Sequence, residues 1–186
     1  MVHHITTPLS ENAAKLLKAG DTVYITGTVY TARDAAHKRL AEIIEAGGEA
    51  PFPVCGGIIY YTGPTPAKPG QVIGSAGPTT SSRMDKYTPD LLDLGLRGMI
   101  GKGARSVETV EAMKRNSSVY FGAIGGAGAL LGSAVIKAEV IAYEDLGAEA
   151  IHRLEVKDFP AVVVIDCEGD CLYETGRQRY IEVRDE

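Results

Sequence analysis

Hydrophobic residues recur every three to four positions in some segments of the chain. Within residues 32–46, Ala36, Leu40, Ile43 and Ile44 fall on one side, which predicts an amphipathic helix ending at the following glycine pair. Similar spacing predicts shorter helices over residues 10–20, with Ser10 as the capping residue, and over residues 88–92, 106–115 and from 125 onward.

Other segments alternate or run together as apolar residues, the pattern of strands. This pattern predicts strands over residues 21–30, 57–61, 72–76, 97–101 and 119–123, followed by strand-like stretches at 141–143, 150–156 and 161–165 and a hairpin around Gly169. His3 and His4 fall outside these elements and are expected to be a dispensable end. Helices and strands alternate early and strands dominate later, so we expect one α/β domain over residues 1–186 with a mixed central sheet.

Composition narrows the class of protein further. The 186 residues are 45% hydrophobic and 23% charged, enough for a core without disulfides or metals. The net charge of −5 argues against a nucleic-acid partner, and no apolar run of about 18 residues is present to span a membrane. Residues 1–5 lack the pattern of a signal peptide. The scattered Cys55, Cys167 and Cys171 match no zinc or cluster spacing, so we expect a cytoplasmic protein that binds no metal itself.

Three cations occupy turns rather than helix faces. Arg33 stands at a strand-to-helix junction, Arg83 ends the hydroxyl-rich loop 77–83, and Lys102 lies between two glycines. Helix starts and glycine turns expose backbone N–H groups, and arginine binds carboxylates through two bonds, so the pattern suggests a small dianionic ligand. Each feature also has an ordinary explanation, as a solvated charge or as a turn whose hydroxyls satisfy the backbone.

Residues 32–39, 60–64, 77–85 and 101–103 resemble the class I fumarate hydratases. The likeness, which covers about residues 21–159, is to their C-terminal domain, which in two-component enzymes is a separate β subunit; the β subunit of L(+)-tartrate dehydratase shares these motifs. The resemblance implies a swivelling β/β/α fold and a hydro-lyase converting fumarate to (S)-malate reversibly. It also implies a cluster-bearing α subunit that holds a [4Fe-4S] cluster, without which this chain is inactive, and an assembly that is a homodimer or α2β2.

The resemblance assigns roles to individual residues. Arg33, Arg83 and Lys102 match positions that grip the substrate carboxylates, and Thr79 matches the position of the group that removes a proton from carbon. Because a threonine is a poor base, it needs help from the cations and from an acidic residue of the partner. His37 and Asp85 are expected to support the site, with Asp85 pairing with a cation. The alternatives are a tartrate dehydratase β subunit and a non-catalytic module that binds dicarboxylates.

Overall fold

Parallel strands joined by helices form the centre of the protein, as the alternating sequence pattern predicts. The computed structural model describes residues 1–123 and 127–181. Within them one seven-stranded sheet has the order β1-β2-β3-β4-β5-β7-β6, and neighbours from β1 to β5 run parallel. The strands are β1 (Val2–Thr6), β2 (Thr22–Thr31), β3 (Ile58–Tyr60), β4 (Gly98–Gly101), β5 (Val119–Gly122), β6 (Val135–Ala142) and β7 (Ile151–Ile165).

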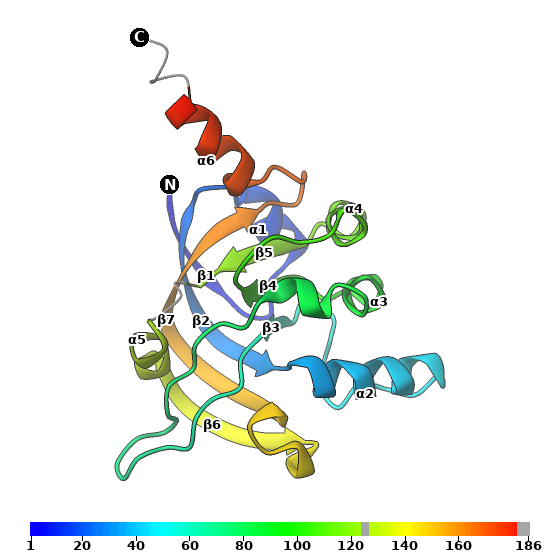
Figure 1. Ribbon diagram of the computed structural model, residues 1–186, viewed down its shortest axis with the longest axis vertical. Helices are drawn as coiled ribbons and strands as arrows, with labels where there is room; N and C mark the ends of the chain where they lie inside the picture. The colour runs from blue at the N-terminus through cyan, green and yellow to red at the C-terminus, as the bar shows by residue number, and fades with distance from the viewer. Residues whose placement is uncertain (124–126, 182–186) are drawn as a thin grey trace.

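The long strand β7 closes this sheet into a barrel-like shape. It pairs antiparallel with β5 and β6 and also with β2, from Thr22 opposite Val162 to Tyr30 opposite Arg153. Figure 1 shows β2 and β7 curving together around the other strands. The single α/β domain with a mixed sheet is therefore confirmed.

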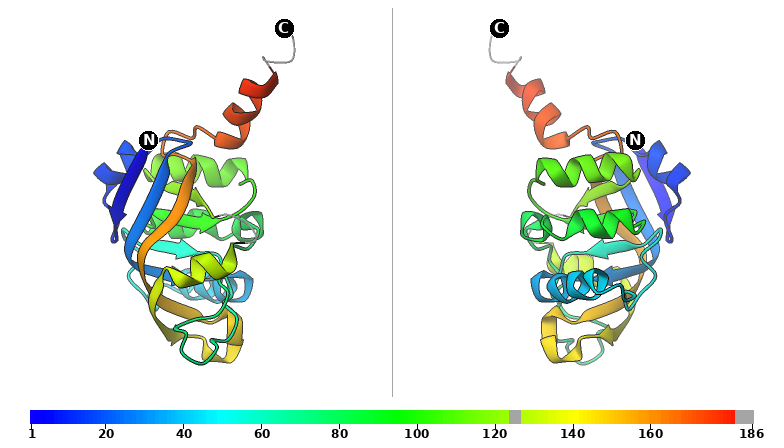
Figure 2. Two further views of the ribbon diagram at one scale, coloured as in Figure 1. Left: turned by 90° about the vertical axis from the view of Figure 1, so that its left-hand side faces the viewer. Right: turned by 90° about the vertical axis from the view of Figure 1, so that its right-hand side faces the viewer.

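The helices gather mainly on one side of the parallel strands. Figure 2 shows α2 (Asp34–Glu45), α3 (Thr88–Asp93) and α4 (Val107–Arg115) stacked there. The other helical segments are α1 (Glu11–Leu16), α5 (Gly128–Ser133), α6 (Leu172–Ile181) and the 3₁₀ turns η1 (Ser81–Met84) and η2 (Glu144–Glu149). Ser10 caps α1, as predicted, by accepting a bond from the Ala13 N–H at 3.2 Å.

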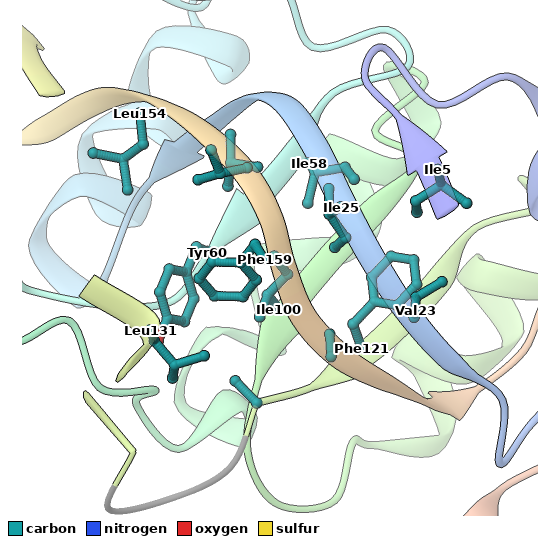
Figure 3. Packing of buried hydrophobic residues seen from close by; sticks show 14 of the residues in the cluster. Ile5, Val23, Ile25, Ile58, Tyr60, Ile100, Phe121, Leu131, Leu154 and Phe159 are labelled. Carbon is teal, nitrogen blue, oxygen red and sulfur yellow. The ribbon is translucent and has the colours of Figure 1, made fainter. Parts of the chain in front are cut away.

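Two apolar layers hold the parallel strands between them. Alternate residues of one strand enter different layers: Ile58 and Tyr60 face the barrel interior, while Ile59 packs toward the helices. Figure 3 shows the inner layer, where Tyr60 and Phe159 meet edge to face at 5.3 Å. Strands buried on both faces are the reason their sequences read as continuous apolar runs.

The predicted strand over residues 72–76 is wrong. This segment bonds instead to Thr65, whose N–H donates to the Ser75 carbonyl at 3.0 Å and whose carbonyl accepts from Gly74 at 3.1 Å. The loop still buries Ile73 against the inner layer. The apolar residues of this segment resemble a strand in the sequence because the loop buries Ile73, but the segment pairs with no strand of the sheet.

The chain ends also differ from the prediction. His3 and His4 belong to β1, and His3 lies 3.0 Å from the buried Asp21 carboxylate. The separate tail strands form part of β6 and the continuous β7. The chain reverses around Gly169 as expected, where a single antiparallel bridge joins Ile165 to Cys171 before α6 begins. The helix expected from residue 125 begins at Gly128, and residues 124–126 lie outside the described residues.

Candidate active site

The predicted site residues come from segments that follow the carboxyl ends of parallel strands. Arg33 follows β2, residues 61–63 follow β3, and Lys102 follows β4. Such ends of parallel strands are where α/β proteins commonly bind ligands. The loop 77–83 reaches the same edge, where the Thr62 hydroxyl donates to the Gly77 carbonyl at 2.8 Å.

Backbone hydrogen bonds place Thr79 beside Lys102. The Thr79 N–H donates to the Tyr61 carbonyl at 2.6 Å, and the Lys102 N–H donates to the Thr79 carbonyl at 3.3 Å. The Ser81 N–H returns a bond to the Lys102 carbonyl at 2.9 Å. Thr79 is half-buried while Thr80 is exposed, so the two neighbouring threonines differ in their surroundings.

The loop is anchored below by a buried hydroxyl pair. Ser81 Oγ lies 2.8 Å from the Tyr120 hydroxyl, which also donates to the Gly103 carbonyl at 3.0 Å. A Cβ at Gly101 would overlap the Ser81 hydroxyl, so glycine is needed there for the two loops to approach. The turns that carry Thr79 and Lys102 are thereby fixed to the sheet.

Arg33 is held between a carboxylate and a glycine. Its Nη2 lies 3.5 Å from Glu149 Oε1, while Glu149 Oε2 accepts a 3.0 Å bond from the Ala35 N–H at the start of α2. A Cβ at Gly63 would lie 2.8 Å from Arg33 Nη1, so the guanidinium packs directly on that backbone. Arg33 is partly buried and is not an ordinary solvated charge.

Arg83 is oriented by Asp34 of α2. Its Nε and Nη2 donate to the two carboxylate oxygens at 2.9 and 2.5 Å. Burial alone would raise the pKa of the Asp34 carboxyl. The bonds and charge of Arg83, a bond from the Asp34 backbone and the charge of Arg33 together outweigh burial and hold that pKa below its ordinary value. Because a guanidinium has five N–H donors, this arrangement leaves the Nη1 edge of Arg83 for a second carboxylate.

His37 lies beneath the site instead of facing it. Its side chain is fully buried, with Nδ1 3.0 Å from the Arg33 carbonyl and the ring edge-on to Tyr61. Burial lowers the pKa of His37 to about 4, so the ring is neutral near neutral pH. Within the structure it braces the turn that carries Arg33.

Asp85 pairs with a cation, and that cation is Arg105, which the sequence analysis missed. Arg105 Nε donates to Asp85 Oδ1 at 2.6 Å, and the Ser106 N–H donates to Oδ2 at 2.7 Å. The Arg105 side chain is fully buried, with its guanidinium 5.3 Å from the centre of the Tyr61 ring. Its position two residues after Gly103 was the only sequence signal, and nothing in that signal indicates burial.

Metal-binding side chains are not clustered in the part of the chain that the structure describes. Cys55, Cys167 and Cys171 are free thiols, exposed, buried and half-buried in that order, and no group of three or more potential ligands is found among the described residues. Nor does any described helix have the length and apolarity required to cross a membrane.

The amino-acid sequence is similar to those of known proteins. The family model described as Fumarase C-terminus matches residues 3–176. The anaerobic class I fumarate hydratase of Escherichia coli (strain K12) is 39% identical over 91% of this chain, but the match covers only 32% of that enzyme. Fumarate hydratase 1, mitochondrial, of Leishmania major is 40% identical over 81% of this chain and 28% of its own length.

A relative of similar length is also found. A Methanocaldococcus jannaschii protein, named for the β subunit of L(+)-tartrate dehydratase, is 35% identical over 94% of this chain and 92% of its own. The chain thus spans about a third of the fumarate hydratases it matches and nearly all of this subunit. Since the family model spans most of its residues, the chain belongs to the fumarase C-terminal family.

Proposed function

We propose that this chain is the β subunit of a two-component class I fumarate hydratase, which hydrates fumarate to (S)-malate reversibly. The proposal is carried by one observation: Arg33, Thr79, Arg83 and Lys102 lie in a connected set of turns at one edge of the sheet. Three cations in such a place suit a substrate with two carboxylates. Two of them are already oriented by carboxylates from other elements.

In the dehydration direction, the first task is removal of a proton from carbon. Thr79 Oγ takes the proton from the carbon next to a carboxylate as its own hydroxyl proton passes to an ionised acidic residue of the partner, and the C–H electron pair moves into the substrate carboxylate. Arg33, Arg83 and Lys102 bind the resulting dianionic carboxylate more tightly than the ground state, which lowers the barrier. The electron pair then returns to form the carbon–carbon double bond as hydroxide leaves.

The second task needs a group from another polypeptide. A [4Fe-4S] cluster in the partner α subunit would supply Lewis-acid assistance to the departing hydroxide. An ionised acidic residue of that partner would accept the hydroxyl proton of Thr79, since a threonine alone is a poor base. This chain therefore contributes carboxylate binding and the proton-abstracting group to a homodimeric or α2β2 assembly.

A tartrate dehydratase β subunit is the second candidate. It is favoured by the match along nearly the whole length of the M. jannaschii protein, where the β subunit is a chain of its own. The hydroxy acids on which the two enzymes act, (S)-malate and L(+)-tartrate, differ by one hydroxyl. Anaerobic reconstitution with a cluster-bearing chain, followed by assays on fumarate and L(+)-tartrate, distinguishes them from each other and from a non-catalytic module, which would turn over neither.

The role of Thr79 is tested against its neighbour. In the reconstituted enzyme, Thr79→Ala should abolish exchange of the substrate C–H proton with solvent deuterium, because that exchange reports proton abstraction alone. The matched control Thr80→Ala should cost at most about 1 kcal/mol, the value of a turn hydrogen bond. If Thr79→Ala keeps normal exchange and Thr80→Ala loses it, the assigned base is wrong.

A further inference from the structure

The strand β6 leaves one edge of the sheet open. It is last in the strand order and, among the described residues, pairs only with β7. Figure 1 shows it at the lower end of the molecule, away from α6. Ile136 is 60% exposed and Val140 44% exposed. An edge strand of eight residues presents free backbone groups to which another strand can bond.

Two pairs of charged residues lie across the ladder between β6 and β7. In one pair β6 carries the positive charge, and in the other it carries the negative charge. Lys137 is opposite Glu155 in the ladder, and Glu139 is opposite Arg153, which donates a 2.8 Å bond to it. One pair therefore ends at the open edge in a positive charge, and the neighbouring pair ends there in a negative charge. All of this lies within the regular part of the ladder, from Lys137 to Val140.

We propose that β6 pairs antiparallel with β6 of a second copy of this chain, about a two-fold axis at Ala138. In an antiparallel pair, two directly opposite residues either both bond to each other through their backbones or both point their backbone groups away. A pairing of two identical strands about a two-fold axis can therefore be centred only on a residue, not between two residues. Centring on Lys137 or Glu139 places like charges opposite each other. Centring on Ala138 places Lys137 of each copy opposite Glu139 of the other.

This register extends both pairs into rows of charge across the joint sheet. Each row then reads Glu155, Lys137, Glu139 of the second copy and Arg153 of the second copy, with signs alternating throughout. Opposite charges across strands stabilise pairing and like charges oppose it. The contact is short, since β6 bulges on either side of the regular ladder, so the dimer is a weak and reversible one.

Sedimentation velocity on the purified full chain tests this pairing. Concentrations up to about 1 mM should show a reversible monomer–dimer equilibrium. Lys137→Glu and Glu139→Lys should each be monomeric, because each variant puts two like-charged pairs at the interface. An equimolar mixture of the two variants should recover a dimer, since every facing pair is then of opposite charge.

Two further measurements locate the interface and guard against unfolding. Lys114→Glu makes the same charge change at an exposed pair on α4 and should leave the dimer unchanged. Hydrogen exchange of the wild-type chain should show residues 135–142 becoming protected as concentration rises. A wild-type chain that stays monomeric up to about 1 mM overturns the proposal. So does a dimer that Lys137→Glu leaves intact, or a mixture that remains monomeric.

Discussion

Removal of the Asp85 charge should destabilise the protein far more than removal of an exposed carboxylate. Asp85 accepts bonds from Arg105 Nε at 2.6 Å and from the Ser106 N–H at 2.7 Å. Arg105 has no exposed side-chain surface, whereas Asp85 is nearly buried. In Asp85→Asn the guanidinium therefore remains buried without its countercharge, and the new amide group directs N–H donors toward another donor.

The size of the effect follows from these contacts. A charge-assisted hydrogen bond contributes about 2 kcal/mol and the bond to the Ser106 N–H about 1 kcal/mol. Breaking a buried ion pair by removing one partner costs about 3–5 kcal/mol in other proteins. We therefore expect Asp85→Asn to lower the free energy of unfolding by about 3 kcal/mol.

The control is an arginine–aspartate pair that lies on the surface. Arg115 donates to both oxygens of Asp93 at 2.9 and 2.7 Å, and both side chains are half exposed. Asp93→Asn should cost no more than about 1 kcal/mol. Urea unfolding monitored by circular dichroism measures the free energy of unfolding of both variants. Equal losses in the two variants would refute the argument that burial of Arg105 makes the Asp85 charge indispensable.

Two other predictions concern the arginine and the histidine of the site. In the reconstituted enzyme, Arg83→Lys should lose roughly 2–4 kcal/mol of transition-state stabilisation in kcat/KM, since lysine keeps the charge but loses the two-pronged geometry with which Arg83 bonds Asp34; a loss of less than about threefold would contradict this. For His37, the unfolded chain takes up a proton near pH 6.5 and the folded chain only near pH 4, so the free energy of unfolding should fall by up to about 3 kcal/mol as pH drops through that window. His37→Gln should lack this part of the pH dependence, and an NMR titration showing a His37 pKa near its ordinary value would disprove it.

Local pattern was enough for the elements that depend on local contacts. The helix over residues 32–46 and the strand over residues 57–61 are both found, because one carries a single apolar stripe and the other is buried on both faces. The strand β1 was missed because its exposure alternates irregularly and its stability comes from pairing with β2, distant in sequence. The long β7 was read as two strands because Lys157 and Asp158 interrupt its apolar run at an exposed point.

In the candidate site too, some residues could be predicted from local sequence and others could not. Its cations are visible in the sequence because glycines and hydroxyl residues mark the turns around them, and the family resemblance identified those turns. The residues that hold the cations are not marked: Asp34, Glu149 and Arg105 look like ordinary surface charges until the fold brings each beside its partner. Their pairing is set by contacts between different elements, which no local pattern records.

Carboxylates from other elements hold Arg33 and Arg83 in place before any ligand binds. Bringing Arg33 and Arg83 to one sheet edge creates repulsion, which Glu149 and Asp34 offset within the folded chain. The free-energy cost of fixing the two guanidinium groups is therefore incurred during folding and not when a ligand binds. Groups fixed in advance in this way are what electrostatic stabilisation of a transition state requires. Lys102 has its backbone fixed by Thr79 and Ser81 while its side chain stays exposed. Two preset donors and one adjustable cation are an arrangement suited to a dicarboxylate whose charge shifts during reaction.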